Sequence, residues 1–178
     1  LNSFPKETAA GMSSLSVQHL LACTKGVKGS WVRRQLCGVV NFLIHRKPPP
    51  AVQPFLCGAE LIALVKETGC PHETDVRPIA IGESLRRLTA KVLLLLCQPL
   101  IDDFFSNSDQ LGMCSGGRDR IIHSIHRHRA DPHASSKHVL LIDFANAFNA
   151  CRRESFLTII ADKFPLMRNF VETCYAAP

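Results

Sequence analysis

The chain has 178 residues, of which 46% are hydrophobic and 20% are charged. This length suits one domain with a packed core or part of a larger one, and the composition excludes a disordered chain. The formal charge of +6 and the pI near 9.0 fit a phosphate-rich partner, because Lys and Arg that neutralise phosphates release condensed counterions. A basic pI alone is weak evidence for nucleic acid.

Eight cysteines are scattered singly, and no two of them have the C-x-x-C spacing. We expect free thiols that pack as small apolar side chains, without a structural zinc site of the usual spacing. The longest apolar run, Val92–Cys97, is far too short to cross a bilayer, and no secretory signal is visible. We interpret the protein as intracellular, in the nucleus or cytoplasm. Because it starts at Leu1 rather than Met, we expect it to be cut from a longer chain.

The first elements in chain order are a lead-in and two helices. Residues 1–14 are turn-rich, and the pattern over residues 15–25 predicts a short helix closed by Gly26. Ser30 is the predicted N-cap of a second helix, which the prolines at positions 48–50 stop. Its predicted apolar face consists of Trp31, Leu36, Val39, Val40, Leu43 and Ile44.

A hairpin and a long helix follow. Two short β-like runs, residues 60–65 and 76–81, flank a polar loop that contains Gly69 and Pro71, which predicts a β-hairpin. Ser84 then caps a predicted helix that runs to about Phe105. The polar side of this helix carries three cations, Arg86, Arg87 and Lys91.

The last third of the chain combines helices with an apolar run. Glycines precede a predicted helix over residues 118–129, and residues 138–142 predict a buried strand that ends at Asp143. Helices are expected from there to Tyr175, so the fold class is α+β. Five histidines in this part, interspersed with arginines that disfavour a dication, are interpreted as a solvated basic face that touches nucleic acid at most. They are His123, His126, His128, His133 and His138.

A carboxylate at the end of a buried strand needs water, a partner or a cation, because burying an unpaired charge is costly. Asp143 ends such a run in the segment VLLIDFANAFN, residues 139–149. Carboxylate oxygens held by a strand suit Mg²⁺, which keeps several waters and takes phosphates as further ligands. Alternatively, Asp143 caps the helix that follows it. The spacing alone leaves both interpretations open.

Four stretches, in this order, resemble reverse transcriptases of non-LTR (LINE-type) retrotransposons. The opening SFPK with a later QHL, the segment DVRPIAIGESLRRLTAK at residues 75–91, QLGMCSGG at residues 110–117, and the run around Asp143 match the family's motifs. Together they cover nearly the whole chain. The resemblance implies a reverse transcriptase domain fragment over residues 1–178, with fingers mainly in 1–135 and the start of the palm in 136–178. The chain departs from the family at Gly11-Met-Ser-Ser-Leu and in a longer hairpin loop, which leaves the pairing of Lys66 with Arg77 uncertain.

The resemblance assigns roles to the residues around Asp143. In that family the motif's aspartate is catalytic and binds both Mg²⁺ ions, for which Mn²⁺ is a possible substitute. Phe144 would ligate a metal through its backbone carbonyl, and Asn146 and Ala147 would line the nucleotide pocket. Phe148 would pack under the sugar of the incoming nucleotide and exclude ribonucleotides.

The same resemblance gives roles to the cations further upstream. Arg77, on the predicted fingers hairpin, would grip the nucleotide triphosphate bidentately. Lys66 would be the second cation, although a solvated hairpin lysine explains it nearly as well. Arg86, Arg87 and Lys91 are expected to contact the template or primer backbone, and a solvated helix face explains them almost equally. The implied partners are an RNA template, a DNA primer, a deoxynucleotide and the rest of the retrotransposon polyprotein.

Two-metal polymerisation needs several converging carboxylates. In the family the others come from an A/F/Y-x-D-D hairpin, which the 178 residues lack. The pair Asp102-Asp103 ends a predicted helix without a hairpin signal and is interpreted as solvated. We therefore expect this chain to be inactive alone. Two alternatives remain, a non-catalytic nucleic-acid-binding remnant of a domesticated element and a decayed copy without function.

Overall fold

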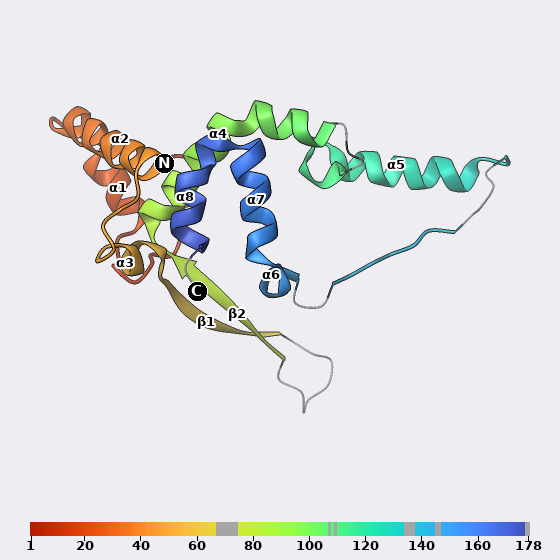
Figure 1. Ribbon diagram of the computed structural model, residues 1–178, viewed down its shortest axis with the longest axis horizontal. Helices are drawn as coiled ribbons and strands as arrows, with labels where there is room; N and C mark the ends of the chain where they lie inside the picture. Colours follow the sequence, from red (N-terminus) through yellow and green to blue (C-terminus); the bar gives the residue numbers. More distant parts are fainter. Residues whose placement is uncertain (67–74, 107, 109, 134–137, 145–146, 177–178) are drawn as a thin grey trace.

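The computed structural model describes the chain except residues 67–74, 107, 109, 134–137, 145–146 and 177–178. The fold is α+β, with helices and, in the described residues, one two-stranded antiparallel sheet (Figure 1). The elements are α1 (Val17–Cys23), α2 (Gly29–His45), α3 (Gln53–Cys57), β1 (Ala59–Lys66), β2 (Asp75–Gly82), α4 (Ser84–Ser106), the 3-10 helix η1 (Leu111–Met113), α5 (Gly117–Ala130), α6 (Ala147–Ala150), α7 (Arg153–Lys163) and α8 (Pro165–Tyr175). Over the described ranges, no helix is both long and apolar enough to span a bilayer.

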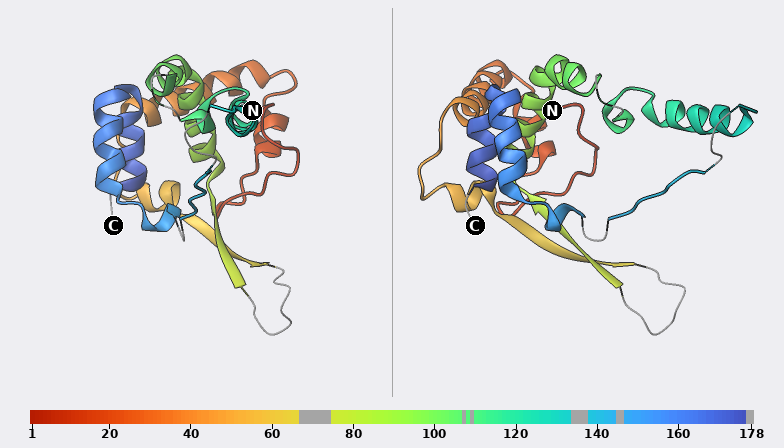
Figure 2. Two further views of the ribbon diagram at one scale, coloured as in Figure 1. Left: turned by 90° about the vertical axis from the view of Figure 1, so that its right-hand side faces the viewer. Right: turned by 45° about the vertical axis from the view of Figure 1, so that its right-hand side comes forward.

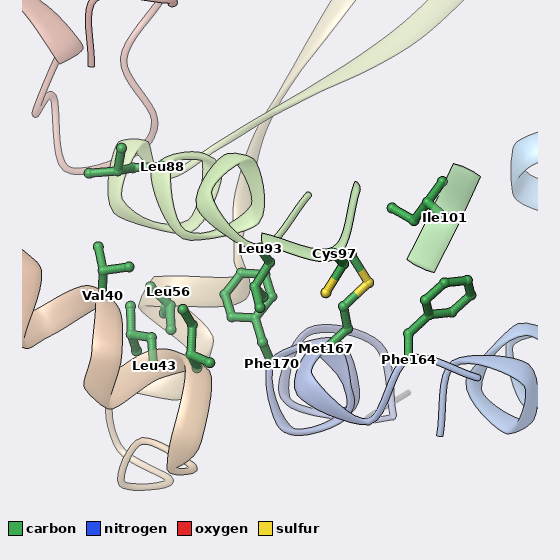
Figure 3. Packing of buried hydrophobic residues seen from close by; sticks show 11 residues of the cluster. Val40, Leu43, Leu56, Leu88, Leu93, Cys97, Ile101, Phe164, Met167 and Phe170 are labelled. Atoms are coloured by element: carbon green, nitrogen blue, oxygen red, sulfur yellow. The ribbon is translucent and has the colours of Figure 1, made fainter. Parts of the chain in front are cut away.

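The hydrophobic core lies where α2, α4 and α8 meet, with α3 closing one end. Figure 3 shows Leu93 and Cys97 of α4 facing Phe170 and Met167 of α8. Helix α2 adds side chains from its last turns. The buried apolar members are Val40, Leu43, Ile44, Leu56, Leu88, Leu93, Cys97, Ile101, Phe164, Met167 and Phe170. The core therefore joins residues from both halves of the chain.

The predicted helices are confirmed, with corrections at the starts of α2 and α4. Helix α2 begins at Gly29, so Ser30 lies inside it and is not its N-cap. Helix α4 begins at Ser84 itself, so Ser84 is its first residue and not its N-cap. The predicted apolar face is confirmed at Val40, Leu43 and Ile44, all of which are buried. It is wrong at Trp31, which is 61% exposed, because the first turns of α2 extend past the partners that cover its last turns. It is also wrong at Val39, which is exposed although its neighbour Val40 is buried.

The predicted hairpin is confirmed, and its register is now defined. Strand β1 pairs with β2 so that Leu64 faces Arg77 and Lys66 faces Asp75. Both faces are open to solvent, since Leu61, Val65 and Ile79 on the two strands are all exposed. Figures 1 and 2 show the hairpin projecting from the helices, so that the end of β1 and the start of β2 lie far from the core. The hairpin is therefore an arm rather than a wall of the domain.

The predicted buried strand at residues 138–142 is wrong. The segment is extended but is not assigned as a strand, and it is exposed, with Leu140 82% and Leu141 87% accessible. A strand exists only through hydrogen bonds to a neighbouring strand. In the part of the chain that the structure describes, no strand lies beside this run. The apolar pattern therefore gives the character of the segment but not its partner.

Helix α8 is fastened to the end of α2 by polar contacts. Glu172 accepts a hydrogen bond from Arg168 at 2.7 Å and pairs with Lys47, just beyond α2, at 3.1 Å. Asn169 donates its side-chain N–H to the carbonyl of His45 at 3.1 Å. The hydrogen bonds from Arg168 and then Lys47 lower the pKa of Glu172 below its ordinary value.

We predict that Glu172→Gln lowers the free energy of unfolding by up to about 1 kcal/mol near neutral pH, the upper range for an exposed ion pair. The pKa of Glu172 is depressed in the folded state, so its contribution is present above the unfolded value of about 4.3 and is lost as the pH falls through the folded value. Urea titrations of both proteins should therefore converge on acidification. Glu154→Gln, an exposed change on α7, is the control and should show no such convergence.

Candidate nucleotide and metal site

Arg77 lies on β2 of the projecting hairpin, where its side chain is exposed. Across the described residues its guanidinium forms no salt bridge, so its donors face solvent. Lys66 ends β1 opposite Asp75, two positions along from the Leu64–Arg77 pair. The register that the sequence left uncertain therefore puts both predicted cations at the outer part of the hairpin. The side chain of Lys66 lies outside the described residues.

Asp143 lies in the extended segment that leads to α6, and its carboxylate is exposed. The neighbouring Phe144 is 75% exposed, so its backbone also stands in an open part of the chain. Because Phe144 is not helical and α6 begins only at Ala147, the alternative in which Asp143 is the helix N-cap is wrong. The expected rigid presentation by a strand is also wrong. Asp143 is thus an accessible carboxylate without a fixed partner in the described chain.

The remaining predicted pocket residues lie near the start of α6. Ala147 is its first residue and is exposed, whereas Asn146 lies outside the described residues. Phe148 belongs to α6, but its side chain also lies outside what the structure describes. In Figure 1 the segment with Asp143 runs from the far end of α5 to α6, while β2 with Arg77 extends below α8. The structure does not bring Asp143 and Arg77 together.

Arg86 has internal partners rather than an open face. Its Nη1 donates to the backbone carbonyl of Cys57 at 2.7 Å, and its guanidinium lies 5.4 Å from the ring centroid of Tyr175. It therefore ties α4 to the ends of α3 and α8. Burial raises the pKa of the nearby Cys174 thiol to about 11 despite the opposing charge of Arg86. A thiol that stays protonated is a poor nucleophile, so Cys174 is a packing residue.

Arg87 and Lys91 hold the lead-in segment against α4. Arg87 donates from Nη2 to the carbonyl of Ala9 and to the hydroxyl of Ser84. Lys91 donates to the carbonyl of Ser3 at 2.7 Å, and its ammonium lies 4.5 Å from the ring centroid of Phe4. These contacts supply a structural role for both cations. Their expected contact with template or primer remains a prediction.

Glu83 also holds the lead-in segment in place, a role that the sequence did not predict. Its side chain is buried, and its two carboxylate oxygens accept hydrogen bonds from the backbone N–H and the hydroxyl of Ser13 at 2.8 and 2.6 Å. Gly11 lies close enough that an added Cβ would be 2.9 Å from the Glu83 Cα. The only local signal was an acidic residue before a helix. Nothing in the sequence linked it to a segment 70 residues earlier.

The other candidate ligands do not form a metal centre. Among the described residues, no three His, Cys, Asp or Glu side chains are grouped closely enough to hold an ion. Asp102 and Asp103 lie on α4 and are exposed, and Asp102 accepts a hydrogen bond from Gln98 at 2.8 Å. Their interpretation as a solvated pair on a helix is confirmed. The described cysteines are free, but their predicted packing as small apolar side chains is wrong at Cys23, Cys37 and Cys151, which are exposed.

Comparisons with protein-family models, with curated proteins and with solved structures found no match to this chain. The site is therefore interpreted from the residues of this chain alone. Its two accessible parts are a cation on a projecting hairpin and a carboxylate on an extended apolar segment. Each has the chemistry expected for a nucleotide site, and they stand apart in the described structure.

Proposed function

We propose that this chain is the fingers and first part of the palm of an RNA-directed DNA polymerase of the non-LTR retrotransposon type. The observation that carries the proposal is the order of four motifs along the chain, at the opening, at residues 75–91, at 110–117 and around Asp143. The hairpin adds support, because Arg77 lies exposed on a strand that projects from the helices. A guanidinium in that position is free to bind a triphosphate bidentately.

The carboxylate chemistry of the chain fits divalent cations only in part. Asp143 offers two hard oxygens in solvent, and the Phe144 carbonyl is the next backbone oxygen, which suits Mg²⁺ or Mn²⁺. Two-metal transfer needs further converging carboxylates. The bound ions would neutralise charge on the phosphates. We therefore propose that the chain binds part of the site and does not polymerise alone.

The proposed activity also requires a partner strand for the exposed run at residues 138–142. Its apolar side chains and extended backbone are ready to pair, but pairing needs the edge of another strand. When such a strand is present, Asp143 would be held at the end of a sheet. Arg77 would orient the triphosphate of a deoxynucleotide that pairs with an RNA template. The primer 3′-hydroxyl would attack the α-phosphate, lose its proton, and displace pyrophosphate. Phe148 would select against a ribose 2′-hydroxyl.

The proposal is tested by fusing this chain, after residue 178, to the remaining palm of a retrotransposon reverse transcriptase that carries the missing D-D pair. We expect Mg²⁺-dependent incorporation of deoxynucleotides on an RNA template, measured by primer extension. The matched control is the same fusion with the donor's D-D pair changed to Ala-Ala, which should be inactive. A fusion that folds by circular dichroism yet extends no primer contradicts the proposal.

A second candidate function is a non-catalytic nucleic-acid-binding remnant. It is favoured by the basic helix α5, whose arginines suit a phosphate backbone. This function requires salt-sensitive binding of RNA or DNA that Mg²⁺ does not alter. The fusion separates the two candidates, since a remnant would bind nucleic acid without gaining polymerase activity.

A further inference from the structure

Helix α5 concentrates the positive charge of the chain. Its 14 residues contain four arginines and one acidic residue, Asp119, which give a formal charge of +3 with the histidines neutral. The whole chain of 178 residues carries +6. Half of the net charge therefore lies on one helix.

The charges are arranged on a defined face. Arg120, His123 and Arg127 are spaced three and four residues apart, so they follow one side of the helix. The isoleucines of α5 fall on the opposite side, where Ile121 and Ile122 are 41% and 42% exposed. At about 1.5 Å per residue, Arg120 and Arg127 are roughly 10 Å apart along the axis. A phosphate strand rises about 3.4 Å per nucleotide, so this distance spans about three phosphates.

The helix is held at one end and open elsewhere. Gly117 packs so tightly on η1 that an added Cβ would overlap the carbonyl oxygen of Leu111. Beyond that contact, α5 extends away from the helical core, as Figure 1 and the right view of Figure 2 show. Arg118, Arg120 and Arg127 are exposed, and across the described residues their guanidiniums have no ion-pair partner. The anchor therefore presents exposed arginines on a projecting element, and Arg120 borders a pocket that Asp102 of α4 also lines.

A nucleic-acid backbone fits this face better than a lipid surface does. Helices that lie in a membrane interface bury a strongly apolar face that usually carries Trp, Phe or Leu. The apolar side of α5 consists of three isoleucines, with Arg118 on the same side. Arginine and histidine donors at helical spacing, by contrast, suit successive phosphates.

We propose that the Arg120–His123–Arg127 face of α5 binds the phosphate backbone of nucleic acid without base specificity. This surface lies apart from Arg77 and Asp143 and from the internal contacts of Arg86, Arg87 and Lys91. Binding there needs neither a metal ion nor a nucleotide. Its failure would leave the polymerase proposal standing, and failure of the polymerase fusion would leave this surface standing.

The test uses the full chain and a fluorescein-labelled single-stranded RNA of about 20 nucleotides, in EDTA, with anisotropy measured over a range of KCl concentrations. Each phosphate contact to a single strand adds about 0.7 to the slope of log affinity against log salt. The double variant R120Q/R127Q should therefore lose about 1.4 from the slope and bind roughly 25-fold more weakly at ~0.1 M salt. Glutamine is a good helix former, so α5 should persist.

The matched control is K25Q/K28Q, which removes two charges from exposed lysines at the α1–α2 connection. It should bind RNA nearly as the parent does. The proposal is overturned if the parent does not bind RNA, if R120Q/R127Q binds like the parent, or if both double variants weaken equally. It is also overturned if α5 instead binds phosphatidylserine vesicles and R120Q/R127Q loses that binding while keeping RNA.

Discussion

Asp143→Ala should abolish RNA-templated incorporation in the fusion with a complete palm, with a loss of at least about 10³-fold. Removing a carboxylate that holds metal ions at the reacting phosphates takes away several kcal/mol of transition-state stabilisation, and each ~1.4 kcal/mol is a factor of ten. The Asp143 side chain is exposed in the described chain and packs against nothing, so the substitution should leave the fold intact. Primer extension under single-turnover conditions measures the effect.

The matched control is Asp162→Ala on α7, another exposed aspartate, which pairs with the adjacent Lys163 at 2.8 Å. This variant should extend primers like the parent fusion. Binding of the RNA–primer duplex should be nearly unchanged in both variants. If the Asp143 variant extends a primer as well as the parent does, Asp143 is not the metal ligand and the motif assignment is wrong.

Local signals predicted the helices and the hairpin of this fold well. Helix α4 and helix α5 begin and end close to the residues that periodicity and glycine placement indicated. The hairpin needed only two short β-like runs around a turn, and its strands extend one residue beyond the predicted ones at each end. Such elements form through contacts between near neighbours in the chain. Sequence pattern is therefore a sufficient guide to them.

The errors concern interactions between distant segments. Residues 138–142 have the composition of a strand, but the described chain supplies no neighbour for it. The sequence around Arg87 and Lys91 does not show whether these cations contact the lead-in segment or a phosphate. The buried Glu83 accepts a hydrogen bond from Ser13, which lies 70 residues earlier. Only a folded arrangement shows which polar groups satisfy one another.

In the candidate site, too, the features that depend on local contacts were predicted and those that depend on distant segments were not. The sequence predicted the position of Arg77 on a strand, because that depends on the hairpin alone. It could not predict whether Arg77 and Asp143 approach one another, because this depends on how residues 138–142 are paired. Under the proposed function, the exposed carboxylate and the exposed guanidinium would form one site only when residues 138–142 join a sheet.

The core prediction with the largest expected effect concerns α4, where four leucines follow one another at positions 93–96. Periodicity alone does not identify the one that faces the core, but Leu93 is 2% exposed and Leu95 is 68% exposed. Leu93 packs between α2 and α8 at the point where the helices converge (Figure 3). We expect Leu93→Ala to lower the free energy of unfolding by about 2–5 kcal/mol, through lost burial and the cavity left behind.

Leu95→Ala removes the same atoms from the same helix, two residues away, and should change stability by no more than about 0.5 kcal/mol. Urea unfolding followed by circular dichroism measures both, with the slope of the transition reporting whether the folded states remain comparable. Equal destabilisation by the two variants would place the core on another face of α4. Because Leu93 of α4 packs against Phe170 of α8, that outcome would also mean that α8 does not pack on α4 as described.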